Sequence, residues 1–133
     1  MKSKTQKNSD ESPMGVVLGG VTYDVSDKPS HGVVRGVRKL QKEITIGLIK
    51  KHRDKFTKEM KVEEAMQKIF EEDPEEFANF TDANDEFIIA GTISLATNKL
   101  WTFDALAACY EEEIESALEK CKEKLGGDVT TFL

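Results

Sequence analysis

Four side chains have the type of chemistry that could bind a metal or attack a substrate: His31, His52, Cys109 and Cys121. Both histidines lie in polar, basic stretches, and neither has carboxylates or cysteines at the intervals that a zinc site of three or four ligands requires. We therefore predict that each histidine is exposed to solvent or caps a helix. A nucleophilic cysteine needs a neighbouring base, and the spacing supplies none. The sequence thus predicts no catalytic residues, no metal and no cofactor, and a protein that is not an enzyme.

The two cysteines are expected on one helix, Cys109 and Cys121 being about 18 Å apart at roughly 1.5 Å per residue. That distance is too long for a disulfide, so we expect reduced thiols in a cytoplasmic protein. No stretch approaches the about 20 apolar residues of a membrane span, and the first residues lack the apolar region of a secretory signal.

Charge is divided unevenly along the 133 residues. Residues 31–58 carry nine Lys and Arg against two Asp and Glu, whereas residues 59–125 carry six against eighteen, and the formal net charge is −6. Four basic residues at helical spacing share one face: Arg35, Arg38, Lys39 and Lys42. This basic face could bind phosphates, but no aromatic residues alternate with it for base stacking, so nucleic acid is not the expected partner. We expect the face to pair with acidic helices of the same chain or of a neighbouring subunit, and the chain to form a homo-oligomer.

A β-hairpin is expected near the start of the chain. Two short β-prone runs, 16–18 and 21–25, flank Gly19 and Gly20, which suit a two-residue turn with positive φ. Its apolar residues, Val16, Leu18, Val21, Tyr23 and Val25, must find cover in the fold. Residues 1–14 are polar and are expected to be a flexible arm.

Amphipathic helices follow the hairpin. We predict helices at about 31–58 (Ser30 as cap), from Val62 to Asp73, from Thr81 or Asp82 to about Thr97, and from Thr102 to Leu125, with a helical turn at Pro74 and with a possible break at 44–47. Gly126 and Gly127 end the last helix, and the tail 128–133 is β-prone. The predicted class is α+β, mainly α: an N-terminal hairpin followed by four or five amphipathic helices in one domain, residues 15–127.

The layout resembles a family. The hairpin ends in Gly20-Val21-Thr22-Tyr23-Asp24-Val25. A basic helix with Val37-Arg38-Lys39-Leu40-Gln41-Lys42 and several acidic helices follow it. This order of elements, over roughly residues 15–126, resembles the tail assembly chaperones of long-tailed bacteriophages. The resemblance implies a non-enzymatic protein of the host cytoplasm that coats the aggregation-prone tape measure protein during tail assembly. It assigns no functional residue.

Coating a helical partner requires an adaptable apolar groove. The side chains that we expect to contribute to it are Tyr23, Met60, Met66, Phe77, Phe80 and Trp101, although Trp101 is most simply a packing anchor. Two alternatives stay open: a virion structural or connector protein whose ends lace into neighbouring subunits, and a small nucleic-acid-binding regulator that uses residues 35–58.

Overall fold

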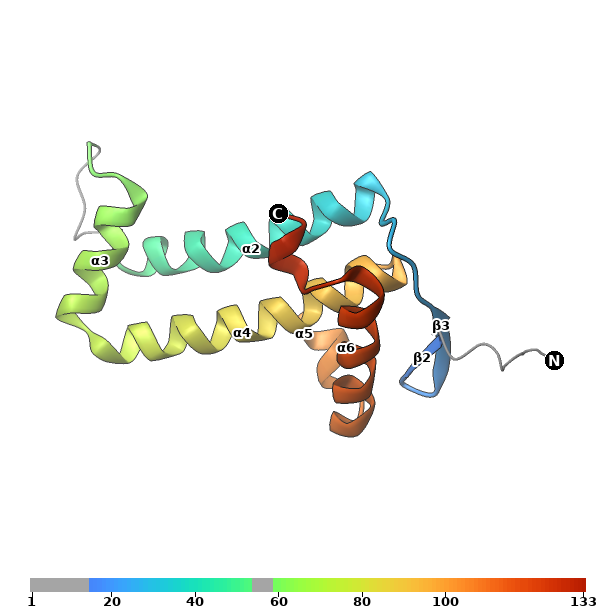
Figure 1. The fold of residues 1–133 in the computed structure, drawn as a ribbon. Helices are drawn as coiled ribbons and strands as arrows, with labels where there is room; N and C mark the ends of the chain where they lie inside the picture. Colours follow the sequence, from blue (N-terminus) through green and yellow to red (C-terminus); the bar gives the residue numbers. More distant parts are fainter. Residues whose placement is uncertain (1–14, 54–58) are drawn as a thin grey trace.

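The structure is a computed structural model that describes residues 15–53 and 59–133. The predicted flexible arm 1–14 lies outside the described residues. The elements, labelled as in Figure 1, are β2 (Gly15–Leu18), β3 (Val21–Asp24), α2 (His31–Lys51), α3 (Val62–Glu72), α4 (Pro74–Thr97), α5 (Phe103–Ala107), α6 (Glu111–Leu125) and a 3-10 turn, η2 (Val129–Thr131). The predicted class, mainly α with an N-terminal hairpin, is confirmed.

The hairpin forms as predicted. β2 and β3 pair antiparallel, with Val16 opposite Tyr23 and Leu18 opposite Val21, and the turn places Gly19 at φ 61° and Gly20 at φ 80°. The hairpin rests on α6, where the backbone N–H of Gly19 donates to Glu113 Oε1 (3.1 Å) and Lys120 Nζ donates to the Gly15 carbonyl (3.4 Å). Val16 and Leu18 are buried there, but Val21 is exposed, so the expectation that Val21 would be covered is wrong.

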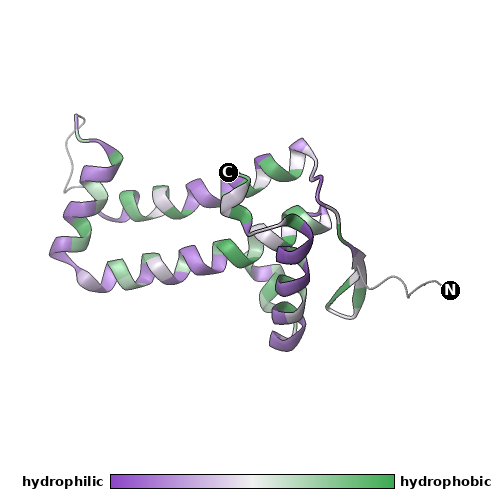
Figure 2. Cartoon of the chain, in the orientation of Figure 1, coloured by the Kyte–Doolittle hydropathy of each residue, from purple (hydrophilic) through white to green (hydrophobic). Residues whose placement is uncertain are grey.

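Helices α2 and α4 form a long antiparallel pair (Figure 1). From here on, the arm means this helix pair and not residues 1–14. At its base the Ser30 hydroxyl accepts from the N–H of Val33, and the N–H of Ser30 donates to Asn98 Oδ1 (2.8 Å). At its far end α3 connects the two long helices. In Figure 2, hydrophilic and hydrophobic residues alternate along α2, α4 and α6, as expected for helices that bury one face. The apolar stripe of α2 does face inward, since Val37 and Leu48 are buried.

Three predicted helix boundaries are wrong. The helix that starts at His31 ends at Lys51, where the backbone N–H of His52 donates to the Ile49 carbonyl; the predicted residues 54–58 lie outside the described part. No break occurs at 44–47. The Pro74 turn and the following helix are one helix, because Thr81 does not act as a cap: its hydroxyl donates to the Phe77 carbonyl (2.9 Å) inside the helix.

The last predicted helix is instead two helices. Thr102 caps α5 as predicted, its hydroxyl accepting from the N–H of Ala105 (3.1 Å). The chain then turns extended at Tyr110, and α6 begins with three glutamates in its first turn, where negative charge favours a helix N-terminus. Cys109 therefore lies in the break between the helices and Cys121 on α6, and both are free thiols.

The C-terminal segment packs on its own chain. After Gly126, which ends α6 in the left-handed region (φ 77°), residues 129–131 form a 3-10 turn and not the predicted β-prone extension. Val129 is fully buried, and its N–H donates to Thr92 Oγ1 (2.9 Å). This contact closes a core built on the second half of α4, which includes Phe87, Ile93 and Leu95.

None of the helices within 15–53 and 59–133 combines the length and the apolar character that a bilayer span needs.

Candidate functional site

An aromatic cluster occupies the far end of the arm, which we call the tip. Phe70 of α3 packs on two rings of α4: it meets Phe77 edge to face with ring centroids 5.1 Å apart, and Phe80 at 5.5 Å with the planes tilted by 47°. Such pairs stabilise a fold by about 0.5–1.5 kcal/mol beyond the burial of their area. Phe77 nevertheless leaves 55 % of its surface exposed. A large apolar ring is therefore held in a fixed position while much of it faces solvent.

A hollow of about 480 Å³ lies beside this cluster, and we call it the tip hollow. It is lined by the apolar residues Met66, Phe70 and Phe77 and by three exposed polar residues, which we call its rim: Glu63, Gln67 and Glu71. Its size is within the about 300–1,000 Å³ of typical ligand sites. Met66 is half-buried, and its unbranched side chain can adapt to differently shaped partners.

The structure does not gather all the predicted groove residues in one place. Met66, Phe77 and Phe80 come together at the tip, and Met60, which is half-buried, lies just before α3. Tyr23 and Trp101 meet each other instead at the base of the arm, edge to face with centroids 5.2 Å apart. Trp101 is only 4 % exposed and carries Lys99 Nζ at 4.3 Å from its ring centroid, so it is a packing anchor and not an exposed contact.

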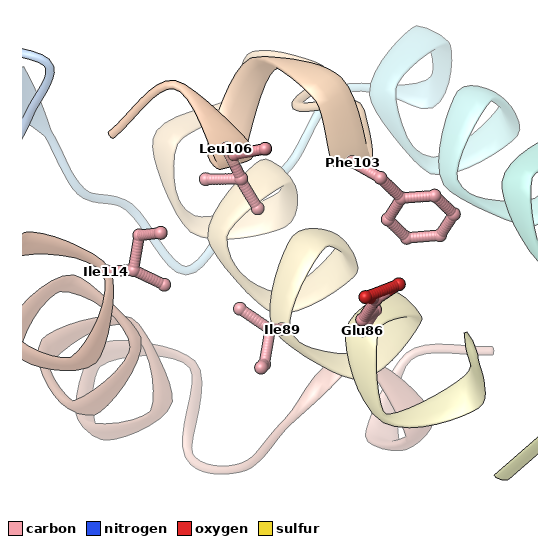
Figure 3. Close-up of a pocket in the computed structure, with 6 residues that line it drawn as sticks. Glu86, Ile89, Phe103, Leu106 and Ile114 are labelled. Atoms are coloured by element: carbon pink, nitrogen blue, oxygen red, sulfur yellow. The ribbon is translucent and has the colours of Figure 1, made fainter. Parts of the chain in front are cut away.

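Smaller hollows lie nearer the base. Figure 3 shows one of about 180 Å³, where Phe103 and Leu106 of α5 face Ile89 and Glu86 of α4, with Ile114 of α6 at the side. Phe103 also lines a hollow of about 340 Å³ against Leu40 and Ile44 of α2, among others.

The four residues of the basic face, Arg35, Arg38, Lys39 and Lys42, are all exposed along α2. The expected pairing of this face with the chain's own acidic helices does not occur: across 15–53 and 59–133, none of the four makes an ion pair. The face is therefore open to solvent or to a partner.

The ion pairs join the ends of α2 and α4 at the tip. Lys51 Nζ lies 2.6 Å from Glu76 Oε1, and His52 Nε2 lies 3.3 Å from Glu76 Oε2. The hydrogen bond from Lys51 lowers the pKa of the Glu76 carboxyl, burial opposes this, and His52 contributes further lowering. The same hydrogen bond raises the pKa of Lys51. A buried carboxylate thus stays ionised where the two helices meet.

The two histidines differ sharply. His31 is exposed at the first residue of α2, as predicted. His52 is the residue that ends the same helix, and it is buried beside Asp73 and Glu76 and not exposed to solvent. The sequence could not reveal these neighbours, because they are more than twenty positions away and are brought close only by the return of α4.

The two thiols lie between α5 and α6 (Cys109) and on α6 (Cys121). Burial raises the pKa of Cys121 to about 12. Cys109 donates to the Ala105 carbonyl (3.6 Å), and burial, followed by the nearby Glu113 carboxylate, raises its pKa as well. Both groups are therefore mostly protonated at neutral pH, which is unfavourable for nucleophilic attack.

Comparison of this chain with known protein families, with curated proteins and with solved structures found no match.

Proposed function

We propose that this protein is a non-enzymatic, protein-binding chaperone of phage tail assembly, which covers apolar stripes of the helical tape measure protein. The observation that supports the proposal best is the half-exposed aromatic cluster at the tip. Phe77 is held against Phe70 and yet exposes 55 % of its surface above the tip hollow. Exposed aromatic rings with an adaptable methionine beside them are typical of surfaces that bind apolar helices.

The charge of the rim favours one kind of helix. Glu63 and Glu71 lie on α3 at the edge of the tip hollow, and both are exposed. A partner helix with an apolar stripe flanked by Lys or Arg would bury its stripe on Phe77 and Met66 while its charges meet these carboxylates. Apolar burial would supply most of the affinity, and the rim charges would add selectivity and a faster association rate.

Co-expression tests the proposal. A tape measure protein from the same genome should be insoluble alone and soluble with this chain. Phe77→Ser should reduce binding about 30-fold or more, the change that corresponds to a hot-spot loss of about 2 kcal/mol. Val17→Ser is the matched control, because Val17 is a comparably exposed apolar residue (46 %) on the hairpin, far from the tip in sequence and fold.

Equal solubilisation by the wild type and the Phe77→Ser variant would contradict the assignment of the tip as the binding surface. Failure of the wild-type chain to keep the tape measure protein in solution would contradict the chaperone function itself.

The basic face supports a second candidate, a nucleic-acid-binding regulator. Its four cations are exposed and make no ion pair within the described ranges. Phosphate binding by such a face would be strongly weakened by salt, whereas binding of an apolar helix at the tip would change little. The salt dependence of binding therefore separates the two candidates.

A further inference from the structure

Three potential ligands meet at the junction between the end of α2 and the start of α4. His52 caps α2, Asp73 precedes Pro74, and Glu76 lies in the first turn of α4. One ligand atom from each, an imidazole nitrogen or a carboxylate oxygen, lies within 4.8 Å of the other two. His52 is 9 % exposed and Glu76 6 %, so two of the three are almost fully removed from water.

The separation of the two buried ligand atoms fits a shared ion. Zinc binds histidine nitrogen at about 2.0–2.1 Å and carboxylate oxygen at about 2.0–2.2 Å in tetrahedral geometry, which sets the two ligand atoms about 3.4 Å apart. His52 Nε2 and Glu76 Oε2 are 3.3 Å apart. Asp73 is half-buried, and one of its carboxylate oxygens lies within 4.8 Å of a ligand atom of each of the other two residues.

The buried imidazole nitrogen of His52 is held close to the Glu76 carboxylate but is poorly satisfied by it. Nε2 is fully buried and, among the described residues, lies at ion-pair distance from Glu76 Oε2 (3.3 Å) without a hydrogen bond of good geometry. A buried polar atom without a partner is costly, and native folds usually provide one. An imidazole nitrogen that lies near two carboxylates can share a divalent cation with them.

We propose that His52, Asp73 and Glu76 form a binding site for a divalent transition metal ion of the zinc type, with water in the remaining position. One nitrogen and two carboxylate oxygens suit zinc better than calcium or magnesium, which prefer oxygen ligands alone. The ion would link the end of α2 to the start of α4. It would thereby fix the tip, including the orientation of α3, and this role goes beyond the proposed partner binding.

Lys51 does not block this site. Its ammonium binds the other oxygen of Glu76, Oε1, at 2.6 Å, and 63 % of its side chain is exposed, so solvent screens its charge. Hydrogen bonds to the second oxygen of a metal-binding carboxylate are common and hold the ligand in place. Lys51 therefore orients Glu76 with Oε2 toward His52.

Zinc titration of the full chain tests the proposal. Cys109→Ser is used as the background, because a half-buried thiol could bind zinc independently. We expect one zinc ion per chain by calorimetry and a rise in melting temperature with zinc concentration. His52→Ala and Glu76→Gln should each weaken zinc binding at least tenfold. His31→Ala should leave it unchanged, and it is a matched control because His31 is the only other histidine and lies at the opposite end of the same helix.

Two measurements keep the test decisive if His52→Ala folds poorly. Asp73→Asn retains a side chain that can cap α4 but removes a charged ligand, so it should also weaken zinc binding. In NMR spectra, zinc should shift the imidazole signals of one histidine, His52, and leave those of His31 in place. The proposal would be overturned if the full chain bound no zinc, or if the His52→Ala and Glu76→Gln variants bound zinc as tightly as the chain without these substitutions.

Discussion

Two glycines inside long helices should respond in opposite directions to the same substitution. A Cβ at Gly91 of α4 would lie 2.7 Å from Val129 Cγ2 and 3.1 Å from Val129 Cβ, whereas a Cβ at Gly47 of α2 would meet no atom within 4 Å. Carbon atoms prefer separations of about 3.5–4.0 Å, so Val129 would have to retreat by about 0.8–1.3 Å from a methyl group at position 91. Val129 cannot move freely, because its N–H is bonded to Thr92 beside Gly91.

The magnitudes follow from this geometry. Replacing a mid-helix glycine with alanine stabilises a helix by about 1 kcal/mol when nothing else changes. Gly47→Ala should gain up to that amount. Overpacking costs about 1–3 kcal/mol, so Gly91→Ala should lower the free energy of unfolding by about 0–2 kcal/mol net. Val129→Ala should lower it by about 2–3 kcal/mol, since two buried methyl groups are lost and a cavity remains.

The double variant Gly91→Ala/Val129→Ala measures the contact directly. The new methyl group would occupy space that Val129 has vacated, so the double variant should be more stable than the sum of the single changes by about 1 kcal/mol or more. Urea unfolding followed by circular dichroism gives each value, provided that the m-value stays constant. Additivity within about 0.5 kcal/mol, or a gain in stability for Gly91→Ala equal to that for Gly47→Ala, would refute the close packing of the C-terminal segment on α4.

Three further predictions concern the thiols, the turn and the basic face. Cys121 should resist alkylation at pH 8 in the folded protein while Cys109 reacts slowly, as mass spectrometry would show. Burial raises the pKa of Cys121 to about 12 from an ordinary value of 9.0. The contribution of this thiol to the free energy of unfolding, measured against Cys121→Ala, should therefore fall as pH rises from about 9 to about 12. Gly20→Val should lower the free energy of unfolding by about 1–3 kcal/mol in denaturant titrations, because valine is strained at φ 80°, and an unchanged midpoint would contradict the turn geometry. Reversing the charges of Arg35 and Arg38 should leave partner solubilisation intact. The nucleic-acid function would be favoured instead if the protein bound duplex tightly, if this binding weakened steeply between about 50 and 200 mM salt, and if the charge reversal abolished it.

Local signals in the sequence predicted the features whose cause is local. The Gly19–Gly20 turn, the Ser30 and Thr102 caps and the Gly126 helix end each depend on a residue and its near neighbours. The continuity of α4 was mispredicted because Thr81 is compatible with both a cap and a helix interior, where its hydroxyl can bond the carbonyl four residues earlier. The division between α5 and α6 was missed because the apolar periodicity continues across it, from Phe103 to Ile114.

The candidate site was predicted in part, for the same reason. The periodicity of 62–70 indicates that Met66 and Phe70 share a helix face, and Phe77 and Phe80 share the next one. That these faces meet depends on how the chain turns at Asp73 and Pro74, which no local pattern fixes. Of the two interpretations of Trp101, packing anchor or exposed contact, tertiary packing against Tyr23 gives the first.

The two proposals for the tip can be separated because they use different side chains of the same junction. The apolar surface is formed by Met66, Phe70 and Phe77, whereas the proposed ion would be held by the cap of α2 and by residues 73 and 76. The Phe77 ring is mostly exposed, so its loss should spare zinc binding. Loss of His52 should abolish zinc binding, and it should weaken partner binding only if the ion sets the orientation of α3. Measuring partner affinity for His52→Ala and for the zinc-free wild type therefore shows whether the junction only stabilises the tip or also controls access to it.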